Sequence, residues 1–199
     1  MSLLRPVVGV TVLLWLLLGL AYPLAMVGVS QAVLPWQANG SPVYLHGRLI
    51  GSAHVGQNFK PNPLYFWGRP SATLSVSTGK PKPYNALASS PSNLGPTNAE
   101  LIAHIKRRIA VLLKQTPGLR VNQIPADLVE SSGSGLDPDI SVQAALIQIP
   151  RVARNTHLSA QFLHRLVEAS VLAPDWGMFG VARVNVLALN LRLYQALHG

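Results

Sequence analysis

The run VVGVTVLLWLLLGLAYPLAMVGVSQAV, residues 7–33, decides the architecture of this chain because it contains no charged side chain. Its first 23 residues, Val7 to Val29, would form a helix of roughly 34 Å at about 1.5 Å per residue, long enough to cross a hydrocarbon core of about 30 Å. After Leu34 the sequence is polar and rich in proline, glycine, serine and asparagine, with no second run of this kind. We therefore predict one transmembrane helix at residues 7–33 and one domain at residues 37–199.

The short tail at residues 1–6 indicates on which side of the membrane the domain lies. Arg5 and the terminal amine are its positive charges, and short basic tails stay cytoplasmic while long domains are translocated largely regardless of their own charge. We expect a single-pass protein of a bacterial inner membrane, with a cytoplasmic N-terminus and an extracytoplasmic C-terminal domain. A cleaved signal peptide is the alternative, because Ser30-Gln31-Ala32 fits a cleavage site. The length of the apolar run, about twice the usual 7–15 residues, favours a retained anchor.

One side of the predicted helix carries a stripe of small side chains at helical spacing. The stripe consists of Ala21, Ala25, Gly28 and Ala32. In lipid, small residues let helices approach closely, so the stripe is a candidate packing face; a plain anchor with incidental alanines is the alternative. Pro23 lies within the stripe and predicts a kink unless a neighbour accommodates it.

Charge and cysteine content limit the possible partners and chemistry. The chain has 199 residues and a formal net charge of +9, with no acidic residue before Glu100. The predicted topology excludes nucleic acid, whereas acidic membrane lipid, an acidic partner surface or a merely scattered basic surface remain open. Because the chain has no cysteine, disulfides and thiol catalysis are excluded.

The first part of the domain combines a hairpin with a long irregular segment. Alternation over residues 43–55 around His46-Gly47 predicts a β-hairpin with a two-residue turn. Residues 56–98 carry seven prolines and no periodicity, as either a disordered linker or an ordered wrapping loop would. Aromatic residues in this segment favour the ordered loop.

Helical periodicity dominates the rest of the chain. We predict a helix capped by Thr97 over residues 98–116, a short one from Pro125, one from Ser141 that Pro150 kinks or restarts, and two more at residues 159–172 and 182–197. The fold class is therefore α+β: a single N-terminal transmembrane helix, then an extracytoplasmic domain with a small β-hairpin, a long irregular loop and several C-terminal helices.

No arrangement of residues in the sequence predicts a catalytic centre or a metal site. The six histidines are dispersed, and neither a GxSxG motif nor a phosphate-binding P-loop is present. Residues 130–139 hold three carboxylates and three hydroxyls that could bind a cation, but a helix end, a turn and a cap for the next helix explain them more simply.

A set of motifs then follows in an order typical of one family. The motifs are Gly56-Gln57-Asn58-Phe59, Tyr65-Phe66-Trp67-Gly68-Arg69-Pro70-Ser71-Ala72, Tyr84-Asn85-Ala86, Ser92-Asn93-Leu94-Gly95-Pro96-Thr97-Asn98, Pro125-Ala126-Asp127-Leu128-Val129, Ser131-Ser132-Gly133-Ser134-Gly135-Leu136-Asp137-Pro138, Pro150-Arg151-Val152-Ala153 and Val184-Asn185-Val186-Leu187-Ala188-Leu189-Asn190. Through them, nearly the whole chain resembles the C subunit of the Kdp-type potassium-transporting P-type ATPase. It departs from the family at Ser89-Ser90-Pro91, usually Ser-Gly-Gly, and at residues 174–182.

The resemblance implies an accessory subunit of an ATP-driven, high-affinity potassium uptake complex. Its partners would be a channel-like potassium-binding subunit, a P-type ATPase subunit and a small single-span subunit. It would stabilise the assembly and act as a catalytic chaperone that raises the ATP affinity of the ATPase subunit. ATP and magnesium would act at that partner, with no cofactor bound directly here, and K⁺ would be the transported ion. Since ATP is cytoplasmic, we expect coupling through the membrane helix.

The resemblance also implies candidate residues for subunit contacts. The family-motif residues concerned are Gln57, Asn58, Phe59, Tyr65, Phe66, Gly68, Arg69, Pro70, Ser71, Tyr84, Asn85, Ser92, Asn93, Leu94, Gly95, Pro96, Ser132, Gly133, Ser134, Gly135, Leu136, Asp137 and Pro138. We expect residues 57–72 and 92–96 to form a surface for the channel-like subunit and residues 133–138 to set the fold; a wholly structural role is the alternative. Two rival functions remain, an anchored binding module and an anchored hydrolase that uses Asp137 or Asp139.

Overall fold

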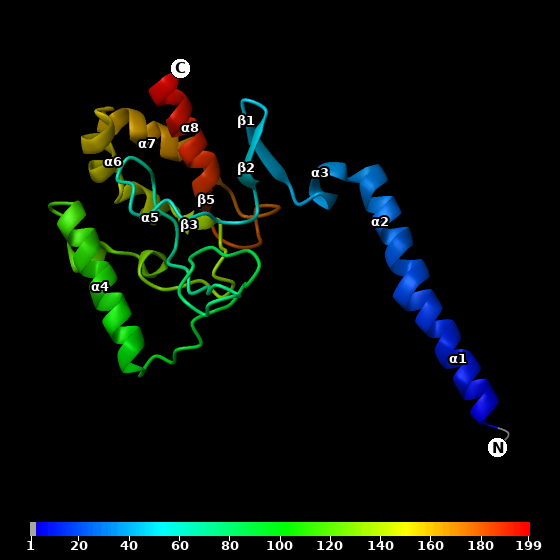
Figure 1. Cartoon of the computed structure of the whole chain (residues 1–199). Helices are drawn as coiled ribbons and strands as arrows, with labels where there is room; N and C mark the ends of the chain where they lie inside the picture. The colour runs from blue at the N-terminus through cyan, green and yellow to red at the C-terminus, as the bar shows by residue number, and fades with distance from the viewer. Residues whose placement is uncertain (1–2) are drawn as a thin grey trace. The chain divides into compact units, whose positions relative to one another are not determined.

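The computed structural model describes residues 3–199, which form two compact units, Met1–Ser52 and Ala53–Gly199. Figure 1 shows the elements of both units in chain order. The first unit holds the apolar helix and a hairpin, and the second holds every other helix and strand. Each unit is described by itself below.

One long apolar helix makes up most of the first unit. It consists of α1 (Leu4–Leu16), a π-helical segment η1 (Leu17–Ala21) and α2 (Tyr22–Val33), followed by a short helix α3 (Pro35–Ala38). Residues Leu4–Val33 are 30 residues with a mean hydropathy of 2.2, which makes them a candidate membrane span. The wider π turn directly precedes Pro23, whose ring has no room beside the carbonyl four residues earlier in an unbroken α-helix.

The predicted hairpin is confirmed in the first unit. Strands β1 (Pro42–Leu45) and β2 (Arg48–Ser52) pair in antiparallel fashion, with Leu45 opposite Arg48. His46 and Gly47 both have positive φ, as a two-residue turn that matches the strand twist requires. The ladder shifts register once, between Val43 and Tyr44.

The second unit begins with an irregular segment and continues with helices and a small sheet. Its elements are α4 (Ala99–Gln115), the 3₁₀ turns η2 (Val121–Gln123) and η3 (Ala126–Leu128), β3 (Asp139–Ser141), α5 (Val142–Leu146), α6 (Ile149–Thr156), α7 (Ala160–Glu168), β4 (Val171–Leu172), β5 (Arg183–Asn185) and α8 (Val186–His198). The fold is therefore α+β, with the apolar helix where the sequence predicts it and with C-terminal helices that are shorter than predicted.

A three-stranded antiparallel sheet was missed by the sequence analysis. Its strand order is β3-β5-β4, with Ile140 opposite Val184 and Val171 also opposite Val184. The prediction that residues 171–172 and 183–185 are helical is wrong. These strands are two or three residues long, too short for an alternating pattern to show, and α8 starts only where the Asn185 side chain accepts a hydrogen bond from Ala188 N.

The helix ends correct one predicted cap, and serine side chains cap two other helices. Asn98, not Thr97, caps α4: its side-chain oxygen accepts from the Glu100 amide at 2.7 Å. Ser141 caps α5 and Ser159 caps α7, each through its hydroxyl. Pro150 restarts the chain as a first-turn residue of α6 rather than kinking a longer helix.

The core of the second unit lies between the irregular segment, α5–α8 and the sheet. Fully buried apolar residues come from both kinds of structure, and they include Phe66, Trp67, Val152, Leu163, Val167, Val184, Leu189 and Leu193. In Figure 1, residues 56–98 form the cyan-to-green trace in the middle of the second unit, and α4 lies to the left of this trace. Residues 56–98 thus form an ordered wrapping loop, which confirms the interpretation drawn from its aromatic residues.

Candidate functional site

The irregular loop is held in the core by amide side chains from two helices. Asn190 of α8 accepts a hydrogen bond from Phe66 N at 2.8 Å and donates to Phe66 O at 2.9 Å. Gln148, just before α6, accepts from Trp67 N at 2.8 Å and donates to Trp67 O at 3.0 Å. Each side-chain amide therefore forms the two hydrogen bonds to buried backbone that a neighbouring strand would otherwise provide.

Arg151 of α6 supports the same part of the loop. Its guanidinium donates to Pro63 O at 2.7 Å and Tyr65 O at 3.0 Å, and its carbon Cζ lies 4.1 Å from the Trp67 ring centroid. It also donates to Gln148 Oε1 at 2.7 Å. Arg151 is 1 % exposed, and burial lowers its pKa to about 10. A charged side chain thus fixes the position of the Trp67 ring.

Hydroxyl groups order the second half of the loop. Ser71 Oγ accepts from Tyr84 N at 2.9 Å, and Thr73 Oγ1 accepts from Asn85 N at 3.0 Å while it donates to Lys82 O. The Tyr84 hydroxyl donates to Arg69 O at 2.5 Å. Burial raises the pKa of Tyr84, so the phenol stays protonated. These hydrogen bonds join the two ends of the segment from Arg69 to Asn85.

Two glycines let the 131–138 motif pack directly against this loop. A Cβ atom on Gly56 would lie 2.5 Å from both Asp137 O and Tyr84 Cε1. A Cβ on Gly135, which has φ +68°, would lie 2.6 Å from Thr73 Cγ2. The Arg69 guanidinium also forms an ion pair with Asp137 at 3.0 Å. Motifs that are up to eighty residues apart in the sequence therefore meet in one structural unit.

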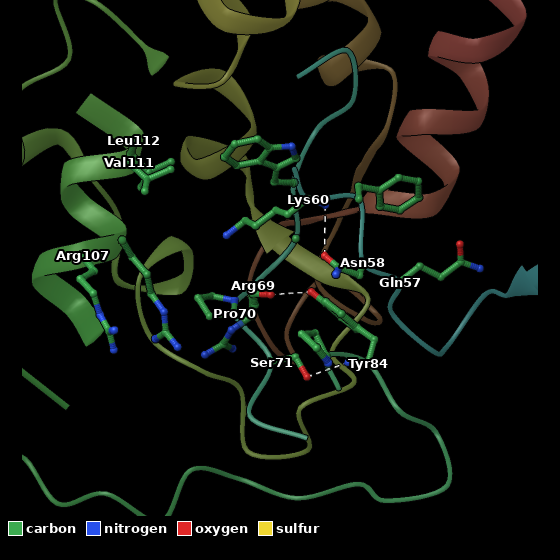
Figure 2. A pocket seen from close by; sticks show the side chains of 15 residues that line it. Gln57, Asn58, Lys60, Arg69, Pro70, Ser71, Tyr84, Arg107, Val111 and Leu112 are labelled. Carbon is green, nitrogen blue, oxygen red and sulfur yellow. Dashed lines mark hydrogen bonds between the residues drawn. The ribbon is translucent and has the colours of Figure 1, made fainter. Parts of the chain in front are cut away.

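A pocket of about 320 Å³ lies between this loop and α4. Figure 2 shows Lys60 extending toward α4, while Arg69, Ser71 and Tyr84 lie below it. The lining residues are Gln57, Asn58, Phe59, Lys60, Trp67, Gly68, Arg69, Pro70, Ser71, Pro83, Tyr84, Arg107, Arg108, Val111 and Leu112. Four of them are cationic, and none of these described lining residues is acidic.

Of the four cations that line the pocket, Arg69 alone is paired with an acidic side chain among the described residues. Burial, together with Arg108 and Arg151, lowers the pKa of Lys60 to about 8. Burial and then Arg107 also lower the pKa of Arg108, which donates to Val129 O at 2.6 Å. The Nε atom of Arg69 is buried, and among the described residues it has no hydrogen-bond partner. The pocket is therefore a positively charged cavity beside an aromatic ring.

A second hollow contains the 92–94 part of the motifs. It measures about 730 Å³, and Ser92, Asn93 and Leu94 line it together with Thr73 and Ser131. Gly95 and Pro96 lie outside its lining, in the exposed stretch that leads into α4. This hollow is next to the first one, because Ser71, Arg107 and Arg108 line both.

The predicted motif residues divide into a buried set and an accessible set. The buried residues are Phe66, Gly68, Pro70, Asn85, Ser132 and Gly135, and their positions fit the structural alternative. The more accessible ones are Gln57, Asn58, Phe59, Tyr65, Arg69, Ser71, Tyr84, Ser92, Asn93, Leu94, Gly95, Pro96, Gly133, Ser134, Leu136, Asp137 and Pro138. Their assignment to a subunit interface stays a prediction, as does helix packing through Ala21, Ala25, Gly28 and Ala32, which are all exposed.

The acidic loop has partners within the fold. Asp137 pairs with Arg69, and Asp139 accepts from Arg183 Nε at 3.1 Å and from Asn185 at 3.2 Å. A Cβ atom added to Gly133 would have no described residue other than its chain neighbours within 4 Å. Within residues 3–199, no three histidine or acidic side chains are grouped closely enough to hold a metal ion.

The sequence analysis missed the basic residues of the pocket. Lys60 lies between two of the quoted motifs, and Arg107 and Arg108 lie outside all of them. A usable signal was present: no acidic residue occurs before Glu100, and a basic triplet, Lys106-Arg107-Arg108, follows about two turns into the next helix.

Comparison with known proteins gives one consistent result. The family model described as "K+-transporting ATPase, c chain" (KdpC) matches residues 4–195. The chain is 49% identical over 192 residues to the potassium-transporting ATPase KdpC subunit of Variovorax paradoxus, covering 96% of this chain and 95% of that protein. It is 47% identical over 198 residues to the corresponding subunit of Burkholderia vietnamiensis, covering 100% and 98%. The Methylobacterium nodulans protein is 48% identical over 195 residues, with 96% and 95% covered.

Proposed function

The chain belongs to the KdpC family of K⁺-transporting ATPase subunits, and from this premise we propose that it is a non-catalytic subunit that stabilises the transport complex and raises the ATP affinity of the ATPase subunit. Its partners are a channel-like potassium-binding subunit, the P-type ATPase subunit and a small single-span subunit. K⁺ is the ion that the complex carries, and ATP and magnesium act at the ATPase subunit.

The observation that carries this proposal is full-length membership of the family combined with one candidate membrane span. The matched region begins at residue 4 and therefore includes the apolar helix Leu4–Val33 as well as the folded unit. The sequence contains no Asp-Lys-Thr-Gly-Thr phosphorylation motif. Phosphoryl transfer in the proposed complex accordingly belongs to the ATPase subunit.

The proposed topology places the N-terminus in the cytoplasm and residues 37–199 outside it, with the apolar helix retained as an anchor in the inner membrane. Arg5, in the first turn of the helix and ahead of the uncharged run 7–33, supports this orientation. ATP is then on the opposite side of the membrane from the folded unit. Any effect of this subunit on ATP affinity travels through the anchor helix, which must pack differently in two states of the pump.

Co-purification tests the proposed assembly. The full chain with a C-terminal tag is recovered from its native membranes after mild solubilisation, and the proteins that accompany it are identified. We expect a multi-span channel-like protein, a P-type ATPase and K⁺-stimulated ATP hydrolysis in the eluate. Recovery of the chain alone as a single monodisperse species would contradict the proposal.

Replacement of the anchor tests the proposed route of coupling. Residues 7–33 are exchanged for an unrelated membrane span, and the ATP dependence of hydrolysis is measured in the purified complex. We expect the complex to assemble with a raised KM for ATP. A matched control replaces only Ala21, Ala25 and Gly28 with leucine, which fills the small-residue stripe but keeps the span. An unchanged KM in both variants would rule out coupling through this helix.

A further inference from the structure

The pocket beside Trp67 contains a lysine that no acidic group of the chain neutralises. Lys60 Nζ lies 5.3 Å from the Trp67 ring centroid. The charged groups that act on it are Arg108 from α4 and Arg151 from α6, both cations. Lys60 is half-buried, and a charge that is partly removed from water is ordinarily paired, because its desolvation is costly. From this arrangement we propose that the pocket is a binding site for an oxyanion, a phosphate or carboxylate group, held at Lys60.

Arg183 of the same unit, by contrast, is paired with two acidic side chains. Arg183 donates to Asp139 at 3.1 Å and to Asp175 at 3.3 Å. Arg69 has Asp137 on one side of its guanidinium at 3.0 Å, but its Nε is buried without a partner among the described residues. Lys60, which has no acidic partner within residues 3–199, and the unpartnered Nε of Arg69 therefore line the same cavity.

The walls of the cavity favour a small anion over a neutral ligand. Trp67 and Leu112 are buried apolar walls, and such surroundings strengthen an ion pair by excluding water. Arg107 is exposed and stands at the rim, where it can attract an anion from solution. Figure 2 shows Arg107 on the same side of the cavity as the end of the Lys60 side chain. A cavity of about 320 Å³ holds one oxyanion with its remaining water.

Binding of an oxyanion has a measurable consequence for Lys60. Burial and two neighbouring arginines lower its pKa to about 8 in the empty pocket. An anion within hydrogen-bonding distance favours the protonated amine and raises that pKa, typically by about 1–3 units. At pH 7, a rise of one unit in the pKa of Lys60 lowers the fraction of reactive neutral amine about tenfold.

The experiment measures the rate at which an amine-directed reagent modifies each lysine of the full chain in detergent, by mass spectrometry and as a function of pH. Inorganic phosphate is compared with chloride at equal ionic strength. We expect the Lys60 midpoint near pH 8 in chloride to move upward in phosphate, with a fall of about tenfold or more in its rate at pH 7. The exposed Lys80 and Lys82 report on general salt effects and should not change.

Matched variants separate a binding site from general electrostatics. Thermal unfolding of the full chain is followed with and without phosphate, since a ligand that binds only the folded state raises its stability. Lys60→Met keeps the side-chain length without the charge and should abolish the increase in Tm. Lys106→Met removes an exposed charge from α4 and should retain it. An equal increase in both variants would overturn the proposal.

The same readout distinguishes the two sources of the oxyanion. In the purified complex, a carboxylate supplied by a partner subunit would raise the Lys60 midpoint without added phosphate, and phosphate would have no further effect. A free anion would leave the midpoint near pH 8 until phosphate is added. Simple steric coverage of Lys60 would lower its maximal rate without moving the midpoint. A midpoint that phosphate does not move in the isolated chain, and that assembly does not move either, would overturn the proposal.

Discussion

The two halves of the folded unit reach the same degree of burial by different means. In residues 142–198, helices bury apolar faces, and Leu163, Val167 and Leu189 are fully buried. In residues 56–98, Phe66 and Trp67 are buried just as completely, but their backbone is satisfied by the side chains of Asn190 in α8 and Gln148 in the turn before α6 rather than by a helix or ladder. The comparison teaches that order in this protein does not follow regular secondary structure. The basic pocket lies between this irregular half and α4. Proteins often place binding groups on loops that a rigid scaffold holds in position.

Two sets of substitutions are expected to have the largest effects, of comparable size, and the first breaks the contact between the loop and the 131–138 motif. Gly56→Ala places a Cβ atom 2.5 Å from Asp137 O and from Tyr84 Cε1, so the two segments must separate. We expect a loss of about 3 kcal/mol in the free energy of unfolding, at the upper end of overpacking effects. Urea unfolding of the full chain in detergent measures it.

Gly133→Ala is the matched control for this change. Nothing lies within 4 Å of its added Cβ, and the residue is exposed. Its free energy of unfolding should stay within about 0.5 kcal/mol of the wild-type value. Equal effects of the two substitutions would show that the loop does not pack against the motif as described.

The next effect compares a polar anchor with an apolar one on the same helix. Asn190→Leu leaves Phe66 N and O buried without partners, which should cost about 2–4 kcal/mol. Leu189→Ala, one residue earlier and fully buried, should cost about 2–5 kcal/mol. Both are measured by urea unfolding. If Asn190→Leu were neutral, the loop would owe its position to apolar burial alone.

A smaller effect concerns the closure of the second half of the loop. Tyr84→Phe removes the hydroxyl that donates to Arg69 O and should cost about 1 kcal/mol, the typical net contribution of one hydrogen bond. Asn98→Ala removes the cap of α4 and should cost a similar amount, about 1 kcal/mol. Thermal unfolding compares the two. If the Tyr84→Phe variant unfolded at the wild-type temperature, the Tyr84 hydroxyl would not contribute to the stability of the fold.

A separate effect is a pH dependence of the free energy of unfolding that originates in the pocket. The folded pKa of Lys60 is about 8 and its ordinary value is 10.5, so between these values the unfolded chain binds more protons than the folded one. Stability from this lysine therefore rises with pH across that window. Tyr84 acts in the opposite sense above pH 10.0, because burial raises its folded pKa and the unfolded phenol ionises first.

Urea unfolding at a series of pH values measures this dependence. We expect a rise in the free energy of unfolding from about pH 8 to about pH 10 that is absent in Lys60→Met and present in Lys106→Met. A rise of the same size in all three proteins would assign it to other groups.

The sequence predicted the elements that have a repeating pattern. The hairpin around His46-Gly47, the apolar anchor and the amphipathic helix α4 all follow from local periodicity and turn chemistry. The sheet β3-β5-β4 was not predicted, because its strands are two or three residues long and pair across distant segments of the sequence. Thr97 was chosen as a cap over Asn98 because the two candidates are adjacent, and only the backbone geometry distinguishes them.

The candidate site was predictable only through the resemblance, and then in part. The motifs include Arg69, Ser71 and Tyr84, which line the pocket, but the contacts that bring these residues together join atoms far apart in the sequence. Such contacts leave no periodic signal. Lys60, Arg107 and Arg108 were missed for a related reason, since a charge on an irregular loop or a helix surface has no partner until the chain is folded.

Amide hydrogen exchange along the full chain tests most directly the claim that the irregular loop is as firmly folded as the helices. The amides of Phe66, Trp67, Tyr84 and Asn85 donate to side-chain oxygens of Asn190, Gln148, Ser71 and Thr73. We predict that these four amides exchange as slowly as the buried amides of α8. Exchange of all four at the rate of an unstructured chain, with α8 still protected, would contradict the account.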